Sequence, residues 1–229
     1  MNFDFIELTK KYSFPEKRPR HHVAPYLYVP FSKLKVIPEN YPKPIERLNW
    51  EDVFINAKQP NCLDIGSGRG KFLLEFACKH KDKNILGLEI RRNCVEWLEA
   101  VIKGERLENV GILWYNVLNG LNFIENSSLE AIFYLFPDPW PKSRHSKRRA
   151  MNEEMLEELH SKLSQSGKIY FATDIEEIHN YHIELLTQSG KFHFNELQDD
   201  FDWGLPQTNK EISCLQRGKP YFRIIAEKI

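Results

Sequence analysis

The stretch NCLDIGSGRG, residues 61–70, decides the fold that this sequence predicts. Its first residues form an apolar run that ends in an acid, which is typical of a buried strand, and its glycines indicate a tight turn. In residues 71–81 apolar side chains recur on one helical face, at Phe72, Leu73, Phe76 and Ala77. A strand, a glycine turn and a helix in this order predict the first unit of an α/β sheet.

The rest of the chain continues this alternation. Further strands are predicted in NILGLEI (84–90), NVGILWYN (109–116), AIFYLF (131–136) and KIYFAT (168–173). A helix is predicted to begin after Asn152 as its N-cap and to end just before Gly167. Strands alternating with helices predict a parallel sheet covered on both faces. We expect FHFNEL (192–197) and PYFRIIAEK (220–228) to close the sheet as an antiparallel pair, because no convincing crossover helix lies between them.

Length and composition divide the 229 residues into an arm and one domain. Residues 1–58 hold seven of the 13 prolines and show neither strand nor helix periodicity, which predicts a proline-rich N-terminal arm. Residues 59–229 then form the domain. No segment resembles a membrane span or a signal peptide, so we expect a cytoplasmic protein that does not contact membranes. Oligomeric state is left open: a monomer and a homodimer both fit the sequence.

The cysteines indicate neither a metal site nor a disulfide framework. They form no CxxC pair and no close cluster with histidine; the four are Cys62, Cys78, Cys94 and Cys214. We therefore expect free thiols and no bound metal.

The glycine loop predicts a nucleotide-containing ligand. Its pattern is D-x-G-x-G-x-G, starting at Asp64, rather than the GxGxxG of dinucleotide enzymes. An acid at this place repels a pyrophosphate but accepts hydrogen bonds from an ammonium group, which favours S-adenosylmethionine. Glu89, 25 residues later, is placed to bind ribose hydroxyls in either class of ligand. A tight turn with a purely structural role is the alternative for the loop taken alone.

An aspartate flanked by prolines and then a basic cluster follow the fourth predicted strand. Asp138 lies in the sequence Pro-Asp-Pro-Trp-Pro (137–141), at the edge of the sheet where open α/β proteins bind ligands. The next residues, 142–149, contain five bases and no acid, which suits a polyanion such as RNA. Residues 174–211 contain nine acids and two bases, so the net charge of zero conceals two poles. The alternative for the basic cluster is a solvated loop or a localisation-like run.

The motifs LDIGSGRGKFLLEFA, FPDPWPKSRHSKRR, FATD and TNKE together resemble the tRNA (guanine-N7-)-methyltransferase family of class I S-adenosylmethionine-dependent enzymes. The resemblance covers about residues 59–226, and RHHVAPY in the arm is similar to that family's HVNP segment. It implies a Rossmann-like, seven-stranded, mostly parallel sheet with helices on both faces and a C-terminal antiparallel strand. It also implies S-adenosylmethionine as methyl donor, tRNA as partner, and transfer to N7 of a variable-loop guanine, usually at position 46.

The resemblance also implies roles for single residues. Donor-binding residues would be Asp64, Gly66, Gly68, Glu89, Asn116 and Asp138, with Asp138 also catalytic. Substrate-binding residues would be Lys142, Asp174, Thr208 and Glu211, and RNA contacts would come from Arg144, His145, Lys147, Arg148 and Arg149. The chain reads Asn-Val at 116–117, where bacterial members more often have Asp-Ala, and Asn-Lys at 209–210, where an aromatic-containing pair is more usual.

Structural alternatives stand beside several of these roles. Asp174 precedes a helical pattern and could serve as its N-cap, Thr208 could cap the segment that follows it, and Asn116 could end a strand in a turn. Two other functions are also compatible with the motifs: methylation of an exocyclic amine of RNA by an enzyme of the same fold, and RNA binding by a non-catalytic subunit.

Overall fold

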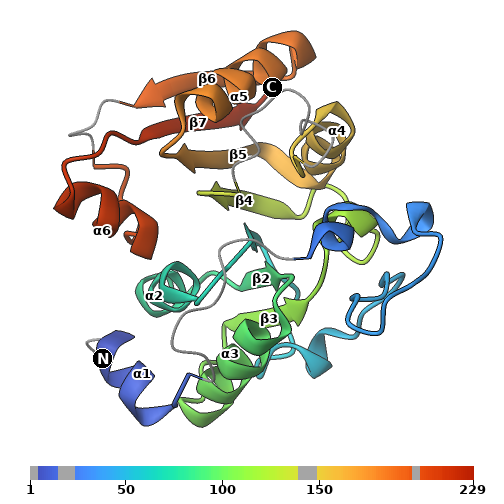
Figure 1. Cartoon of the computed structure of the whole chain (residues 1–229), viewed down its shortest axis with the longest axis vertical. Coiled ribbons are helices and arrows are strands. Elements are labelled where there is room, and N and C mark those ends of the chain that lie inside the picture. Colours follow the sequence, from blue (N-terminus) through green and yellow to red (C-terminus); the bar gives the residue numbers. More distant parts are fainter. Residues whose placement is uncertain (1–4, 15–23, 139–148, 198–201) are drawn as a thin grey trace.

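The computed structural model describes residues 5–14, 24–138, 149–197 and 202–229. These residues contain one seven-stranded sheet with the strand order β3-β2-β1-β4-β5-β7-β6 (Figure 1). Its strands are β1 (Cys62–Ile65), β2 (Ile85–Glu89), β3 (Val110–Trp114), β4 (Leu129–Leu135), β5 (Leu163–Thr173), β6 (Phe192–Leu197) and β7 (Phe222–Lys228). The pairs among β1 to β5 are parallel, and β7 runs antiparallel to both β5 and β6. The predicted sheet and its antiparallel end are confirmed.

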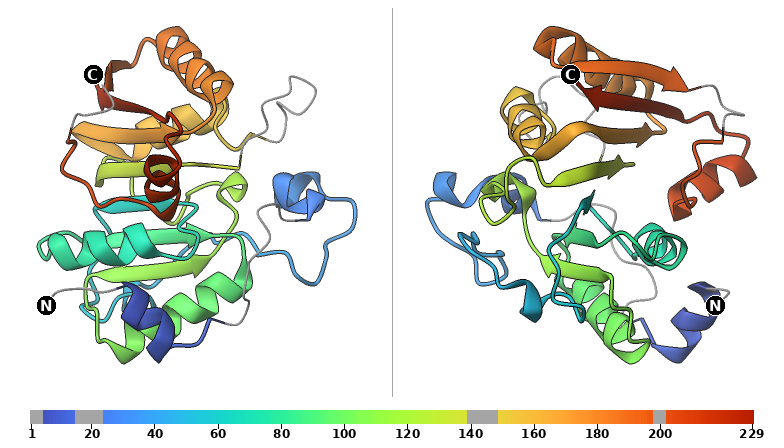
Figure 2. Two further views of the ribbon diagram at one scale, coloured as in Figure 1. Left: turned by 60° about the vertical axis from the view of Figure 1, so that its left-hand side comes forward. Right: turned by 180° about the vertical axis from the view of Figure 1, so that it is seen from behind.

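Helices cover both faces of this sheet. They are α1 (Phe5–Lys11), α2 (Lys71–Lys79), α3 (Arg92–Gly104), α4 (Glu153–Lys162), α5 (Glu176–Ser189) and α6 (Asn209–Gln216). Figures 1 and 2 show α2 and α3 beside β2 and β3, and α4 and α5 beside the strands from β4 to β6. Short 3₁₀ turns are η1 (Pro25–Tyr28), η2 (Phe31–Lys33), η3 (Trp50–Asp52) and η4 (Val117–Asn119).

Alternating strand residues divide the core into two apolar clusters. Leu63 of β1 and Ile132 of β4 belong to a cluster with α4 and α5, whereas Cys62 and Phe133, one residue away on the same strands, belong to a cluster with α2 and α3. This period of two is what a pleated strand buried on both faces requires. It explains why the central strands read as continuous apolar runs.

The glycine turn between β1 and α2 has the conformation that its sequence predicts. Gly66, Gly68 and Gly70 all have positive φ angles, of 87°, 60° and 77°. At Gly70 a Cβ atom would also lie 2.2 Å from the side chain of Leu98. Glycine is therefore required there, both for the left-handed backbone and for the close approach of α3.

One predicted boundary is wrong. Asn152 is the N-cap of α4 and accepts a hydrogen bond from the Met155 amide at 2.9 Å, as expected. The helix, however, ends at Lys162, and Gly167 lies inside β5. A Cβ atom at Gly167 would meet the Leu129 carbonyl oxygen at 2.9 Å, where the register of β4 and β5 shifts. The glycine therefore permits a close backbone approach at an irregular strand pair rather than a helix end.

Among its contacts with the domain, the arm packs against α3 and against β3. Tyr12 accepts a hydrogen bond at its carbonyl from the indole of Trp97 in α3, at 2.6 Å. Farther along, Val53 and Phe54 cover β3 on the face opposite α3, and Phe54 is buried in the cluster of α4 and α5. In Figure 1 this second contact region lies at the right, whereas α1 lies at the lower left. The arm thus contacts both faces of the sheet.

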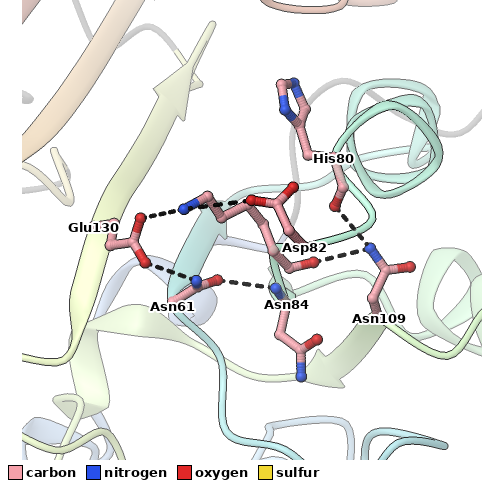
Figure 3. A network of polar contacts seen from close by, with 7 residues as sticks. Asn61, His80, Asp82, Asn84, Asn109 and Glu130 are labelled. Atoms are coloured by element: carbon pink, nitrogen blue, oxygen red, sulfur yellow. Dashed lines mark hydrogen bonds and ion pairs between the residues drawn. The ribbon is translucent and has the colours of Figure 1, made fainter.

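A polar network joins the amino ends of the central strands (Figure 3). The Asn109 amide donates to three backbone carbonyls around the end of α2, those of Ala77, His80 and Lys83. The side chain of Asn61 accepts a hydrogen bond from the backbone N–H of Asn84 at 2.9 Å and donates one to the Glu130 carboxylate at 2.9 Å. These contacts satisfy loop backbone groups at the end of the sheet that lies away from the glycine turn.

Candidate active site

Two adjoining cavities lie at the carboxyl ends of β1, β2 and β4. The first, of about 170 Å³, is lined by Glu89, Asn116, Asp138 and part of the arm. The second, of about 160 Å³, is lined by the glycine turn, the first residues of α2 and the start of α6. Gly66, Arg91 and Phe136 line both. The structure therefore brings the predicted donor-binding residues together at the edge of the sheet where α/β proteins bind ligands.

Asp64 is a buried acid that faces the second cavity. Only 3% of its surface is exposed, and its Oδ2 atom has no hydrogen-bond partner among the described residues. Burial raises the pKa of Asp64 to about 7, because the carboxylate loses its hydration; a contact from the Ser67 side chain lowers the pKa only in part, and the nearby charge of Glu89 raises it further. A buried carboxylate oxygen without a partner is the feature expected of a site that receives a hydrogen-bond donor, such as an ammonium group, from a ligand.

Glu89 is held by the protein itself. Its side chain accepts hydrogen bonds from the Gly68 amide at 2.7 Å, from the Arg91 amide at 2.8 Å and from the Arg91 guanidinium at 3.0 and 3.1 Å. These contacts fix the carboxylate between the glycine turn and the end of β2. A ribose that binds to Glu89 has to replace at least part of the Arg91 contact, so Arg91 belongs to the site although the sequence analysis did not single it out.

The Asn116 side chain caps the turn η4 and also binds the arm. Its Oδ1 accepts from the Leu118 amide at 3.1 Å, which makes it the N-cap of η4, as one of the two sequence interpretations expected. Its Nδ2 donates to the Leu27 carbonyl and to the Tyr41 hydroxyl, each at 2.9 Å. Both amide hydrogens therefore bind the arm, while the residue still lines the first cavity.

Asp138 follows a strained turn. Phe136 has a φ angle of 50°, which is uncommon for a residue with a bulky side chain, and its amide bonds to the Ala172 carbonyl at 2.7 Å. Pro137 then fixes the approach to Asp138, whose side chain is exposed at the mouth of the first cavity. The Tyr28 hydroxyl donates to Oδ2 of Asp138 at 2.5 Å.

The three predicted site residues in the C-terminal part of the chain, Asp174, Thr208 and Glu211, have different roles in the structure. Thr208 and Glu211 form a capping box at the start of α6, and Glu211 is buried, so the cap interpretation of Thr208 is confirmed. Asp174 does not cap α5, whose N-cap is Ile175; its carboxylate instead forms an ion pair with Lys210 at 2.7 Å. Thr208 and Lys210 line the second cavity. The capping box thus fixes the start of α6, which lines the second cavity together with the glycine turn.

Most of the predicted RNA contacts lie outside the described residues. These are Arg144, His145, Lys147 and Arg148, and the predicted substrate-binding residue Lys142 lies outside the described residues as well. Arg149 is described, and its guanidinium lies 4.3 Å from the centre of the Tyr181 ring in α5. This stacking places the end of the basic cluster beside α5.

The residues of the two cavities fit S-adenosylmethionine. Asp64 offers the unpaired oxygen for an amino group, Glu89 a carboxylate for ribose hydroxyls, and the apolar residues of the first cavity, such as Leu88 and Val117, a surface for a base. In the part of the chain that the structure describes, no group of three or more histidine, cysteine or acidic side chains is placed to hold a metal, and no helix is long and apolar enough to cross a membrane.

Comparison with known proteins first defines the class. Residues 58–224 match a family described as "Putative methyltransferase". Two solved structures share the fold: an S-adenosylmethionine-dependent methyltransferase from Aquifex aeolicus (15% identity, 74% of this chain and 82% of that chain, TM-score 0.51) and an antibiotic-related methyltransferase (16% identity, 75% and 88%, TM-score 0.54). The predicted class I methyltransferase fold is confirmed.

The particular family follows from closer relatives. A protein from Synechococcus sp. (strain JA-3-3Ab) named tRNA (guanine-N(7)-)-methyltransferase is 33% identical over 216 residues, which are 93% of this chain and 86% of that protein. Other relatives with comparable identity carry the same name. The chain belongs to the tRNA (guanine-N(7)-)-methyltransferase family.

Sequence reasoning missed Tyr28, Arg91 and Lys210. Arg91 lies two residues after Glu89, at the end of a predicted strand, so an ion pair between the two side chains could have been expected from the sequence. Lys210 was noted only as a departure in the TNKE motif. Tyr28 has no such signal, because its contact with Asp138 joins residues 110 positions apart.

Proposed function

We propose that the protein transfers a methyl group from S-adenosylmethionine to N7 of a guanine in tRNA, at position 46 of the variable loop, and that it does so in the cytoplasm. The observation that carries this proposal is the match, over nearly the whole chain, to relatives named for that activity. The unpaired oxygen of Asp64 supports it independently, because it suits a donor with an amino group.

The donor would be held by Asp64, the glycine turn and Glu89. When bound, S-adenosylmethionine supplies a methyl group on a sulfonium, which is an activated leaving group. The protein's own contribution is to orient the guanine and to exclude water, and orientation of this kind contributes about 7–11 kcal/mol in well-aligned reactions.

Asp138 is the residue that meets the guanine in this proposal. N7 carries an in-plane lone pair and no proton, so the reaction needs no general base. The purine becomes cationic as the new bond forms, and a carboxylate at the mouth of the first cavity stabilises that charge. The same carboxylate accepts hydrogen bonds from the N1–H and N2–H₂ groups of guanine, which adenine does not offer. The basic cluster at 142–149 binds the surrounding phosphates.

The direct test is to incubate unmodified tRNA transcript with the protein and S-adenosylmethionine and to identify the methylated nucleoside by mass spectrometry after digestion. We expect 7-methylguanosine. A product methylated only on an exocyclic amine would assign the chain to the alternative class of enzyme. Donor binding without any methylated product would favour a non-catalytic RNA-binding subunit.

Asp138→Asn tests the assigned role within this function. Removing the charge should lower the single-turnover rate on the order of 100-fold, because the stabilisation is needed only as the guanine becomes cationic. The dissociation constant for tRNA should change little. A near-normal single-turnover rate would remove Asp138 from the chemistry.

A further inference from the structure

The arm reaches the first cavity through η1, and hydrogen bonds at Leu27 and Tyr28 connect it to the domain there. The Leu27 carbonyl accepts from Asn116, and the Tyr28 hydroxyl donates to Asp138. Leu27 is buried, and both arm residues line the cavity together with Glu89. The turn η1 therefore bridges the segment after β3 and the segment after β4.

Through Tyr28 this bridge contacts the Asp138 carboxylate directly. The carboxylate is exposed, and among the described residues Tyr28 is its one hydrogen-bond partner. An exposed aspartate without a partner samples several rotamers, whereas a hydrogen bond to one carboxylate oxygen restricts the group to fewer of them. The contact uses Oδ2, so Oδ1 stays available to a substrate.

The anchor at Asn116 requires an amide rather than an acid. Leu27 presents a carbonyl oxygen, which needs a hydrogen from its partner. Asparagine supplies that hydrogen and a second one to Tyr41, whereas an ionised aspartate has none to donate. Asn116, at the place where bacterial members of the family more often have aspartate, thus provides the hydrogen bonds that hold the arm at the cavity.

We infer that Tyr28 is a positioning residue for methyl transfer: docked through Asn116, it holds the Asp138 carboxylate in the orientation that the guanine requires. This inference rests on the proposed function. It gives the arm a role in the chemistry beyond any contact with tRNA.

The test is a double-mutant cycle with Tyr28→Phe and Asp138→Asn, measured as single-turnover formation of 7-methylguanosine with the full-length protein. Tyr28→Phe keeps the ring and removes the hydroxyl. Tyr26→Phe is the matched control, because Tyr26 lies in the same turn and does not line either cavity. Affinities for S-adenosylmethionine and tRNA are measured for each variant by calorimetry and filter binding.

Loss of a hydrogen bond to a charged group should lower the rate about tenfold in the otherwise unchanged protein, with both affinities within twofold. In the Asp138→Asn background the same change should lower the rate less than twofold, and Tyr26→Phe should change neither. The inference would be overturned if Tyr28→Phe lowered the rate equally with and without Asp138→Asn, or if weaker binding of tRNA or donor accounted for the whole loss. An unchanged or faster rate in Tyr28→Phe would overturn it as well. If the unaltered protein forms no 7-methylguanosine, the proposed function fails; if it does and Tyr28→Phe matches it, only the role of Tyr28 fails.

Discussion

Asp64 connects the electrostatics of the site with the choice of donor. Its buried carboxylate has an oxygen without a partner among the described residues, and burial raises its pKa to about 7. A neutral acid would serve an ammonium group poorly, so in the proposed complex the donor binds the ionised form of Asp64. Below pH 7 the protein would have to release a proton before it binds the donor.

The affinity for S-adenosylmethionine should therefore fall as pH decreases below about 7, by up to about tenfold per pH unit. The affinity decreases toward low pH because the raised pKa leaves Asp64 protonated in the free protein, and this proton has to leave before the donor binds. Calorimetry between pH 5.5 and 7.5 measures this. Asp64→Asn should bind more weakly and without this pH dependence; the same pH dependence in that variant would contradict the assignment.

At the scale of elements, the sequence predicts regular structure better than it predicts the arm. The period of two along β1 and β4 and the helical spacing after Gly70 are local patterns, so the sheet and α2 follow from them. The placement of Gly167 was wrong, because a glycine after a helical pattern signals a helix end as readily as a strand irregularity. The arm shows no periodicity, and its contacts with Asn116 and Asp138 join residues far apart in the chain.

The helix α6 was not predicted, although its capping box was present in the sequence as Thr208 and Glu211. The resemblance assigned both residues to the substrate, and an N-cap was the alternative for Thr208 alone. The structure gives both residues a structural role in the capping box of α6, and Thr208 also lines the second cavity.

Thr208→Ala should lower the free energy of unfolding by about 1 kcal/mol, because it removes the N-cap of α6. Thr208→Ser keeps a hydroxyl that can cap the helix, so its free energy of unfolding should stay close to that of the unaltered protein. Urea unfolding measures the difference. Thr187→Ala is the control, since Thr187 is exposed within α5 and caps nothing. A loss for Thr208→Ala no larger than for Thr187→Ala would show that the cap contributes nothing measurable.

At the scale of the whole molecule, a balanced composition conceals a separation of charge. The basic residues 142–149 follow the acid that faces the first cavity, and the acidic segment 174–211 runs through α5 to the start of α6. Polyanion binding depends on local charge and not on the total, so a net charge of zero is compatible with an RNA substrate.

Replacing Arg148 and Arg149 with alanine should weaken tRNA binding and reduce the slope of log affinity against log salt by about 1–2, because each phosphate contact releases counterions. Donor binding should not change. The matched control replaces Lys79 and Lys81, which are exposed at the end of α2 away from the cavities. An unchanged slope, or an equal loss in the control, would contradict an RNA contact at the basic cluster.

The central claim is the atom that receives the methyl group. The most direct measurement transfers a labelled methyl group to a tRNA transcript and then applies borohydride reduction and aniline, which cleave the chain at N7-methylguanine. We expect cleavage at the variable-loop guanine, in proportion to the label incorporated. Incorporated label without cleavage would contradict the assignment to N7.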